Sequence, residues 1–185
     1  MSSFKIAAVS DTHVPDRTPN LDPALLDAIA LEKVDLILHA GDISSMRVIE
    51  KLQEIAPVIA ARGNRDLLLD PKRVPPLQSI EKYGVKIALL HGHINFLVYW
   101  IDKLQYIVSG YNRDRYVDRL PRVAPQAKVY VFGHTHHAEN FWRQDKLFFN
   151  PGSVTYGDAL TRTKTWGILE LFEDGTLNSR IMDCP

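Results

Sequence analysis

Seven side chains with metal-binding donor atoms stand just after short apolar runs of the sequence. If each run is a buried strand, these side chains gather where the carboxyl ends of strands meet, which is where open α/β sheets bind ligands. Oxygen donors mixed with imidazoles suit first-row divalent metals. The pattern therefore predicts a metal centre. In chain order, five successive runs end in Asp11 and His13, in Asp42, in Asn64, in His91, and in His134 and His136.

The local spacing supports this interpretation. Asp11 and His13 are two residues apart, and so are His134 and His136. In an extended chain, residues two apart point the same way, so Asp11 and His13 can aim at one ion. Asp42 follows a glycine, as Asn64 does, and glycine allows the tight turns that ligand loops need. Seven donors exceed the needs of one ion, and two ions roughly 3.5–4 Å apart that share Asp42 would use them all.

Composition narrows the class of protein. The chain has 185 residues, and its 22 basic side chains balance its 22 acidic ones. We therefore expect one domain over 1–185, without specific nucleic-acid binding and without a membrane as partner. The single cysteine, Cys184, cannot form an internal disulfide, which favours a reducing, cytoplasmic setting. The N-terminus lacks a signal-peptide pattern, and the longest apolar run, 96–101, is too short to cross a bilayer.

The elements that position these residues follow from periodicity. Apolar strands expected at 5–10, 35–40 and 58–61 alternate with helices, which begin at Asp22-Pro23 and at Ser44 or Ser45. This alternation predicts a parallel sheet. The second half contains successive strands without helices between them, which suggests a second sheet packed on the first. The expected strands are a pair within 79–90 that turns at Tyr83-Gly84, then 141–142, 147–149, 165–172 and 177–181. The predicted fold class is thus α/β, a two-sheet sandwich flanked by helices, with the metal site at the carboxyl ends of the strands.

An aromatic-rich insert at about 94–121 separates the strands of the second half. We interpret it as one or two helices that lie near the site, because the insert follows His91 directly. Its aromatic side chains fit three roles: part of the core, a subunit contact in a homo-oligomer, or a lid that grips substrate. Exposed aromatic side chains would favour an interface.

The order of the motifs resembles the calcineurin-like metallophosphoesterase superfamily. The motifs are Asp11-x-His13, Gly41-Asp42, Gly63-Asn64-x-Asp66, His91-Gly92-His93 and Gly133-His134-Thr135-His136. The later stretch Asn150-Pro151-Gly152-Ser153 matches the small branch that contains YfcE-like phosphodiesterases and shares its fold with Vps29. We expect this stretch to be a structural turn near the site.

The resemblance implies a ligand assignment and a mechanism. It implies a hydroxide that bridges two divalent ions and attacks phosphorus in line. Manganese is the metal most often used in the family, and nickel, cobalt, iron and zinc are alternatives. The first ion would be held by Asp11, His13, Asp42 and His136, and the second by Asp42, Asn64, His91 and His134.

Three further residues are candidates for catalysis. Asp66 resembles the acidic residue of the family's Asn-x-Asp element and would orient a ligand or a catalytic imidazole. Arg65 stands where many phosphatases carry histidine. It is a poor acid but could clamp a phosphate oxygen. His93 is then the candidate for protonating the leaving group. In contrast, His39 lies within an apolar run and is expected to be a core histidine.

The leading functional hypothesis is a metal-dependent phosphoesterase acting on a small phosphodiester or phosphomonoester. The preference for diesters rests on the branch resemblance and on the absence of histidine at position 65. Nucleotides, cyclic nucleotides and phospholipid head-group diesters are the substrates considered. The alternative is a non-catalytic, Vps29-like scaffold, although the full set of seven polar side chains makes little sense without metal. A metal-dependent amidase remains a third reading.

Overall fold

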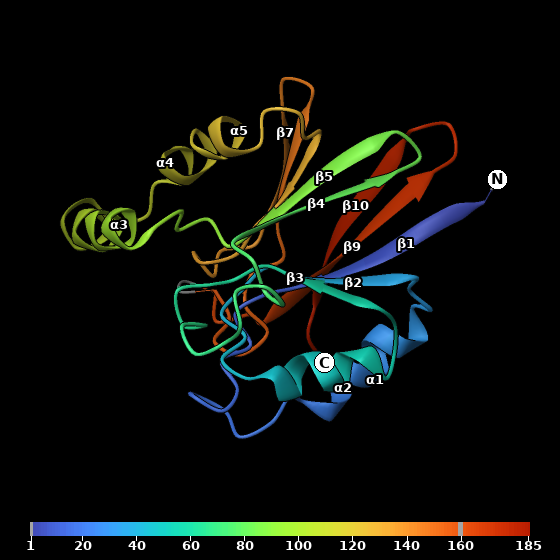
Figure 1. Ribbon diagram of the computed structural model, residues 1–185, viewed down its shortest axis with the longest axis horizontal. Coiled ribbons are helices and arrows are strands. Elements are labelled where there is room, and N and C mark those ends of the chain that lie inside the picture. Colours follow the sequence, from blue (N-terminus) through green and yellow to red (C-terminus); the bar gives the residue numbers. More distant parts are fainter. Residues whose placement is uncertain (1, 159–160) are drawn as a thin grey trace.

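Two facing five-stranded sheets form the centre of the molecule, and helices lie on their outer sides (Figure 1). The structure is a computed structural model and describes residues 2–158 and 161–185. In chain order the elements are β1 Ser3–Val9, α1 Pro23–Leu31, β2 Leu36–His39, α2 Met46–Gln53, β3 Val58–Ala60, β4 Leu77–Lys82, β5 Val85–Leu90, α3 Phe96–Ser109, α4 Arg113–Val117, α5 Leu120–Val123, β6 Val129–Val131, β7 Glu139–Arg143, β8 Lys146–Asn150, β9 Thr165–Phe172 and β10 Leu177–Asp183. The predicted two-sheet sandwich is confirmed.

The strand order corrects one expectation. The first sheet runs β10-β9-β1-β2-β3 and the second β4-β5-β6-β8-β7. The predicted strands at 165–172 and 177–181 therefore do not belong to the second sheet, because β9 pairs antiparallel with β1. The burial pattern explains the placement: most of β9 is buried on both faces, as a strand inside a sheet must be. The parallel pairing of β1 with β2 and of β2 with β3 is as predicted.

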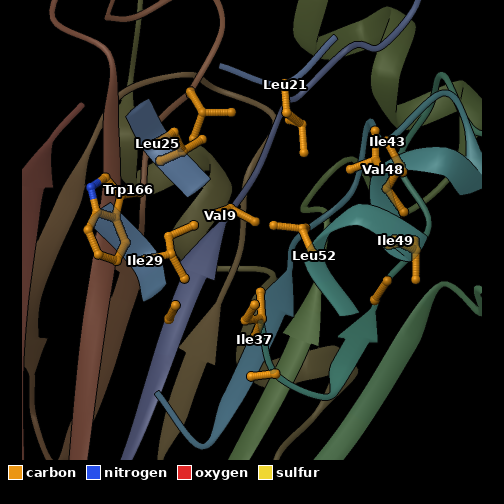
Figure 2. Close-up of a cluster of buried hydrophobic side chains, with 14 of the residues drawn as sticks. Val9, Leu21, Leu25, Ile29, Ile37, Ile43, Val48, Ile49, Leu52 and Trp166 are labelled. Carbon is orange, nitrogen blue, oxygen red and sulfur yellow. The ribbon is translucent and has the colours of Figure 1, made fainter. Parts of the chain in front are cut away.

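Alternation along β1 builds two cores at once. Ile6 and Ala8 belong to the cluster between the sheets. Ala7 and Val9 belong to the cluster beneath α1 and α2, whose side chains pack on the outer face of the first sheet (Figure 2). A third cluster joins α4 and α5 to the outer face of the second sheet. Because β1 is packed on both faces, the loop that follows it is held firmly in place.

The predicted helix starts and the predicted hairpin are confirmed. Asp22 is the N-cap of α1, and its side chain accepts a hydrogen bond from the amide of Ala24 at 3.0 Å. Ser45 caps α2 in the same way. Tyr83 and Gly84 join β4 to β5, both with positive φ, as a two-residue turn of type I′ requires.

The aromatic-rich insert forms three helices, α3, α4 and α5, where one or two were predicted. Of these, α3 lies well away from both sheets (Figure 1). The carboxylate of Asp102 on α3 is buried and accepts two hydrogen bonds from the guanidinium of Arg119, at 2.6 and 2.8 Å. This bidentate pair ties α3 to the segment between α4 and α5. Within the described part of the chain, no helix combines the length and apolar character needed to span a membrane.

Candidate metal centre

The loops after five strands meet at one end of the sandwich. The loops after β1, β2 and β3 come from the first sheet, and those after β5 and β6 come from the second. Hydrogen bonds join the two groups of loops. The amide of His134 donates to Asp11 Oδ2 at 3.1 Å, and His91 Nδ1 lies within hydrogen-bond distance of the carbonyl oxygen of Ala40, at 2.7 Å. The seven predicted ligands are therefore brought to one place from both sheets.

The first half of the centre surrounds Asp11. His136 Nε2 lies 3.3 Å from Asp11 Oδ1, and His13 Nε2 lies 3.8 Å from the same oxygen. His13 Nε2 is also 3.8 Å from Asp42 Oδ2. Asp11, His13 and His136 offer donor atoms that all lie within 4.8 Å of one another, close enough to share an ion.

The second half surrounds the other oxygen of Asp42. His91 Nε2 lies 3.4 Å from Asp42 Oδ1 and 3.1 Å from Asn64 Oδ1. His134 Nδ1 is also 3.1 Å from Asn64 Oδ1. Asp42 thus faces His13 with one oxygen and His91 with the other, the placement expected of a carboxylate shared by two ions. Asp11 also contributes to this half, since it forms a second compact group with Asp42 and His91.

Burial makes this cluster costly without a cation. Asp11 and Asp42 are 0% and 3% exposed, and neither a carboxylate nor an imidazole is buried cheaply without a partner. Asp11 Oδ1 and both ring nitrogens of His13 have no hydrogen-bond partner within the described residues. Asp11 Oδ1 and one ring nitrogen of His13 are donor atoms that a bound metal would use. The donor set therefore fits a divalent ion, as predicted.

Mutual attraction shifts the pKa values of the cluster. Burial acts to lower the pKa of His91, but the carboxylate of Asp42 outweighs it and raises the pKa to about 10. Burial acts to raise the pKa of Asp11, and contact with His136 reverses this, so that the pKa lies below its ordinary value. The carboxylates thus raise the pKa of His91 and His136 and favour a positive charge on these two imidazoles, whereas burial lowers the pKa of His13 and His134. A metal ion would supply that charge instead and displace the protons.

The backbone is bent to present the ligands. Asp11, His13, Asp42, His134 and His136 all have positive φ, between 50° and 75°. Residues other than glycine seldom adopt this conformation, although aspartate and histidine do so more often than most. Such strain clusters at functional sites, where surrounding packing enforces it.

Two glycines let the loops approach one another. A Cβ at Gly63 would overlap the amide nitrogen and Oδ1 of Asp42. At Gly41, where φ is 93°, a Cβ would lie 2.6 Å from His91 Nδ1. The predicted role of these glycines, tight turns beside the ligands, thus has a steric basis.

Asp66 holds the loops rather than facing the cluster. Its Oδ1 accepts hydrogen bonds from the amides of Ile43 and Ser44, at 2.8 and 2.7 Å, and its Oδ2 accepts one from Gly63 at 2.7 Å. Burial raises the pKa of Asp66 above its ordinary value, while the amide bonds act to lower it. The carboxylate joins the loop that carries Asp42 to the loop that follows β3.

The other two catalytic candidates lie at the rim. Arg65 is exposed, and its main-chain amide donates to Asp42 Oδ1 at 2.8 Å. His93 is partly buried, with its ring centre 5.3 Å from that of His91 and 6.0 Å from that of His134. His39 is a satisfied core histidine as predicted: it is fully buried, and its Nδ1 accepts the amide of Gly41.

The stretch 150–153 braces the loop after β1. Asn150 is buried, and its side chain donates to the carbonyl of Gly133 and accepts from the amide of Gly152. Ser153 Oγ donates to the carbonyl of Asp11 at 3.2 Å. These contacts support the predicted structural role.

Three tyrosines lie beside the imidazoles of the cluster. The ring of Tyr156 stacks on His136, with centres 5.3 Å apart, and meets His13 edge-on at 5.2 Å. Tyr99 from α3 meets His134 edge-on at 5.7 Å, and Tyr116 from α4 does so at 6.0 Å. The position of the insert after His91 indicated that it would lie nearby, but no pattern pointed to Tyr156.

Comparison with known proteins decides the family. Residues 4–174 match the calcineurin-like phosphoesterase superfamily domain. The chain belongs to this family. As a metallophosphoesterase, it falls within the hydrolase class, and the resemblance drawn from its motifs is confirmed.

Relatives and solved structures agree with this assignment. A probable metallophosphoesterase of Methanocaldococcus jannaschii is 29% identical to this metallophosphoesterase, over 96% of this chain and 80% of the relative. A phosphodiesterase of the same organism is 28% identical, over 90% and 93% of the two chains. The structure of vacuolar protein sorting 29 from Cryptosporidium parvum superposes with a TM-score of 0.71 at 22% identity, covering 98% of this chain and 97% of the other, which shows that the fold is shared.

Proposed function

We propose that the protein is a metal-dependent phosphodiesterase that acts on a small phosphodiester with two divalent ions. The observation that carries this proposal is the pair of buried carboxylates, Asp11 and Asp42, set among imidazoles with unsatisfied donor atoms. Manganese is the first metal to test, and nickel, cobalt, iron and zinc are the alternatives, since mixed oxygen and imidazole donors accept all of them.

The two oxygens of Asp42 suggest how the seven ligands divide. We assign Asp11, His13 and His136 to one ion and Asn64, His91 and His134 to the other, with Asp42 between them. In this division each ion has one imidazole pair, and the two halves share a carboxylate that already faces both sides. When bound, the ions would supply an acidified water as nucleophile and positive charge at the phosphoryl oxygens.

Three residues would support the reaction from different positions. Asp66 fixes the loop of Asp42 through backbone amides, so we assign it a positioning role. His93 lies beside His91 and His134, within reach of a substrate held there, and would hydrogen-bond the leaving oxygen. The guanidinium of Arg65 would contact a non-bridging phosphoryl oxygen, because its backbone is anchored to Asp42.

The ligand set favours an enzyme over a scaffold with the same fold. A protein-binding module has no evident need to bury two carboxylates next to one another among imidazoles, which is costly. All seven donors are present here, and each lies within 4 Å of another member of the set.

The test is hydrolysis of bis-p-nitrophenyl phosphate, phosphomonoesters and cyclic nucleotides by metal-depleted protein to which single metals are returned. We expect turnover of diesters with manganese and loss of at least about a hundredfold in Asp42→Ala, the size expected for removing a ligand shared by both ions. Asp145→Ala, an exposed aspartate in the turn between β7 and β8, is the control and should retain the parent rate. Parental turnover in Asp42→Ala, or a single bound ion at saturating metal, would refute the two-ion proposal.

We also propose that the protein forms a homodimer through α3. One side of this helix is an apolar stripe of side chains that are 46–79% exposed: Leu97, Trp100, Ile101, Leu104, Ile107 and Val108. The stripe exposes on the order of 700 Å² of side-chain surface, more than most monomers leave in one patch and near the share of one partner in a standard interface.

The spacing and charge of the stripe favour a second copy as the occupant. Its members recur every three or four residues, the spacing of helices that pair with helices. Lys103 is the one basic side chain of α3, whereas helices that lie on membranes are rich in basic residues. Sedimentation should show a dimer for the parent and a monomer for Leu104→Glu, with Leu31→Glu, an exposed leucine on α1, as control. A monomeric parent, or a dimeric Leu104→Glu, would overturn the proposal.

A further inference from the structure

A cavity of about 460 Å³ opens directly beside the candidate metal centre. Its floor includes His134 and His136, so a phosphate held at the metal centre would have one ester group inside it. Tyrosines dominate its walls. Five of the chain's seven tyrosines line it: Tyr99, Tyr106, Tyr111, Tyr116 and Tyr156.

Most of these rings are fixed by the protein. Tyr111 stacks on His137, with ring centres 4.0 Å apart, and its hydroxyl donates to Glu139 at 2.8 Å. Tyr156 stacks on His136. The walls are therefore organised before any ligand arrives, which lowers the entropic cost of binding.

Tyr106 is a solvent-exposed part of the cavity lining. It projects from α3 and is 43% exposed, next to the apolar Ile107. Lys103 and Arg162 also line the cavity, whereas the one carboxylate in its lining, Asp102, is already paired with Arg119. The cavity thus combines aromatic walls with two basic side chains.

We propose that this cavity binds a planar aromatic group esterified to the phosphate, and that the substrate is a nucleoside phosphodiester. This inference rests on the proposed function. Aromatic side chains bind bases through their faces, and phenol hydroxyls suit the polar edges of a base better than an acyl chain. The volume is that of a small-molecule site and fits one nucleoside. A phosphomonoester without an aromatic group would make no stacking contact with the tyrosine rings that line the cavity.

The kinetic test compares two diesters, adenosine 5′-methyl phosphate and glycerophosphocholine, in the manganese-loaded protein. We expect the adenosine diester to be the better substrate. In Tyr106→Ala its KM should rise about fivefold to tenfold, the loss expected for one stacking face, with little change in kcat. Glycerophosphocholine should be unaffected. Tyr106→Phe should retain the parental KM, and Trp142→Ala, an exposed tryptophan on β7, is the control for general loss of an aromatic side chain.

A binding measurement separates this inference from the proposed function. Metal-depleted protein should bind adenosine 5′-monophosphate in equilibrium dialysis, and Tyr106→Ala should weaken that binding by a similar factor. Binding that depends on Tyr106 without hydrolysis of any diester would leave the aromatic site standing and refute the proposed function. Hydrolysis of diesters with equal preference for both compounds, or a parental KM in Tyr106→Ala, would refute the aromatic site alone. Preference for glycerophosphocholine would identify a head-group diesterase instead.

Discussion

Replacement of Asp66 should lower the free energy of unfolding strongly, because its carboxylate holds two loops together. The carboxylate is 1% exposed and accepts three amide hydrogen bonds of 2.7–2.8 Å, from Ile43, Ser44 and Gly63. In Asp66→Ala all three amides lose their acceptor. An unsatisfied buried amide costs about 1–3 kcal/mol, and water entering the vacated space recovers part of it, so the free energy of unfolding should fall by roughly 4 kcal/mol.

Asp66→Asn should have an intermediate effect. Its amide oxygen can still accept the bonds from Ile43 and Ser44, but its NH₂ group would face the amide of Gly63, donor against donor. We expect a loss of about 1–3 kcal/mol from that one position. Because the two loops carry Asp42 and Asn64, both variants should also bind manganese more weakly than the parent.

Urea unfolding in the presence of a chelator measures the free energy of unfolding without a contribution from metal. Calorimetric titration with manganese then measures the affinity for the metal, which should fall if the two ligand loops shift. Asp70→Ala is the control, since Asp70 lies in the same loop and its exposed carboxylate accepts one amide bond, from Lys72. It should lose no more than about 1 kcal/mol. If Asp66→Asn keeps parental stability and manganese affinity yet loses turnover, Asp66 transfers a proton and the positioning role is wrong.

Further outcomes follow from other contacts. Asp102→Ala should release α3 from the rest of the protein while the sandwich stays folded, because breaking the buried ion pair with Arg119 costs about 3–5 kcal/mol. Faster amide hydrogen exchange that is confined to the insert would show this. Gly63→Ala should weaken manganese binding, since its Cβ displaces Asp42, and parental affinity would contradict the steric argument. Burial raises the pKa of Cys184 to about 12, so at pH 8 its reaction with a disulfide reagent should be slower in the folded than in the unfolded protein, by roughly a hundredfold or more. Manganese at about 100 times its dissociation constant should add about 2.7 kcal/mol to the stability for each ion bound, which thermal unfolding with and without chelator would test.

Local chemistry made much of the fold predictable. Asp22-Pro23 and Tyr83-Gly84 marked a helix start and a turn because each pair satisfies a specific backbone requirement. The return of β9 to the first sheet was not predictable in this way. Its sequence shows that it is buried on both faces, but the choice of partner depends on which edge of β1 remains open. The pairing partner of β9 is a property of the assembled sheet, so the sequence near β9 does not predict it.

The same limit applies to the site. Ligand positions could be predicted because the carboxyl end of each strand is a local feature, and the strands converge by topology. The role of Asp66 could not, since its three partners come from two loops and bond through backbone amides that any residue could provide. The tyrosine walls depend likewise on how the insert docks. Tyr156 contacts His136, which lies twenty residues earlier in the chain, and no repeat or spacing in the sequence predicts this contact.

The division of ligands between the sheets explains why the centre and the fold are linked. Both carboxylates and Asn64 lie in loops of the first sheet, whereas three of the four imidazoles lie in loops of the second. The cluster between the sheets is apolar, so it holds them together without fixing how their ends face one another. The relative position of the two sheet ends is set by polar contacts such as the hydrogen bond from the His134 amide to Asp11. Ions bound as we propose would act at the same place, each joining side chains from both sheets, so metal binding would stabilise the end of the sandwich at which the cavity opens.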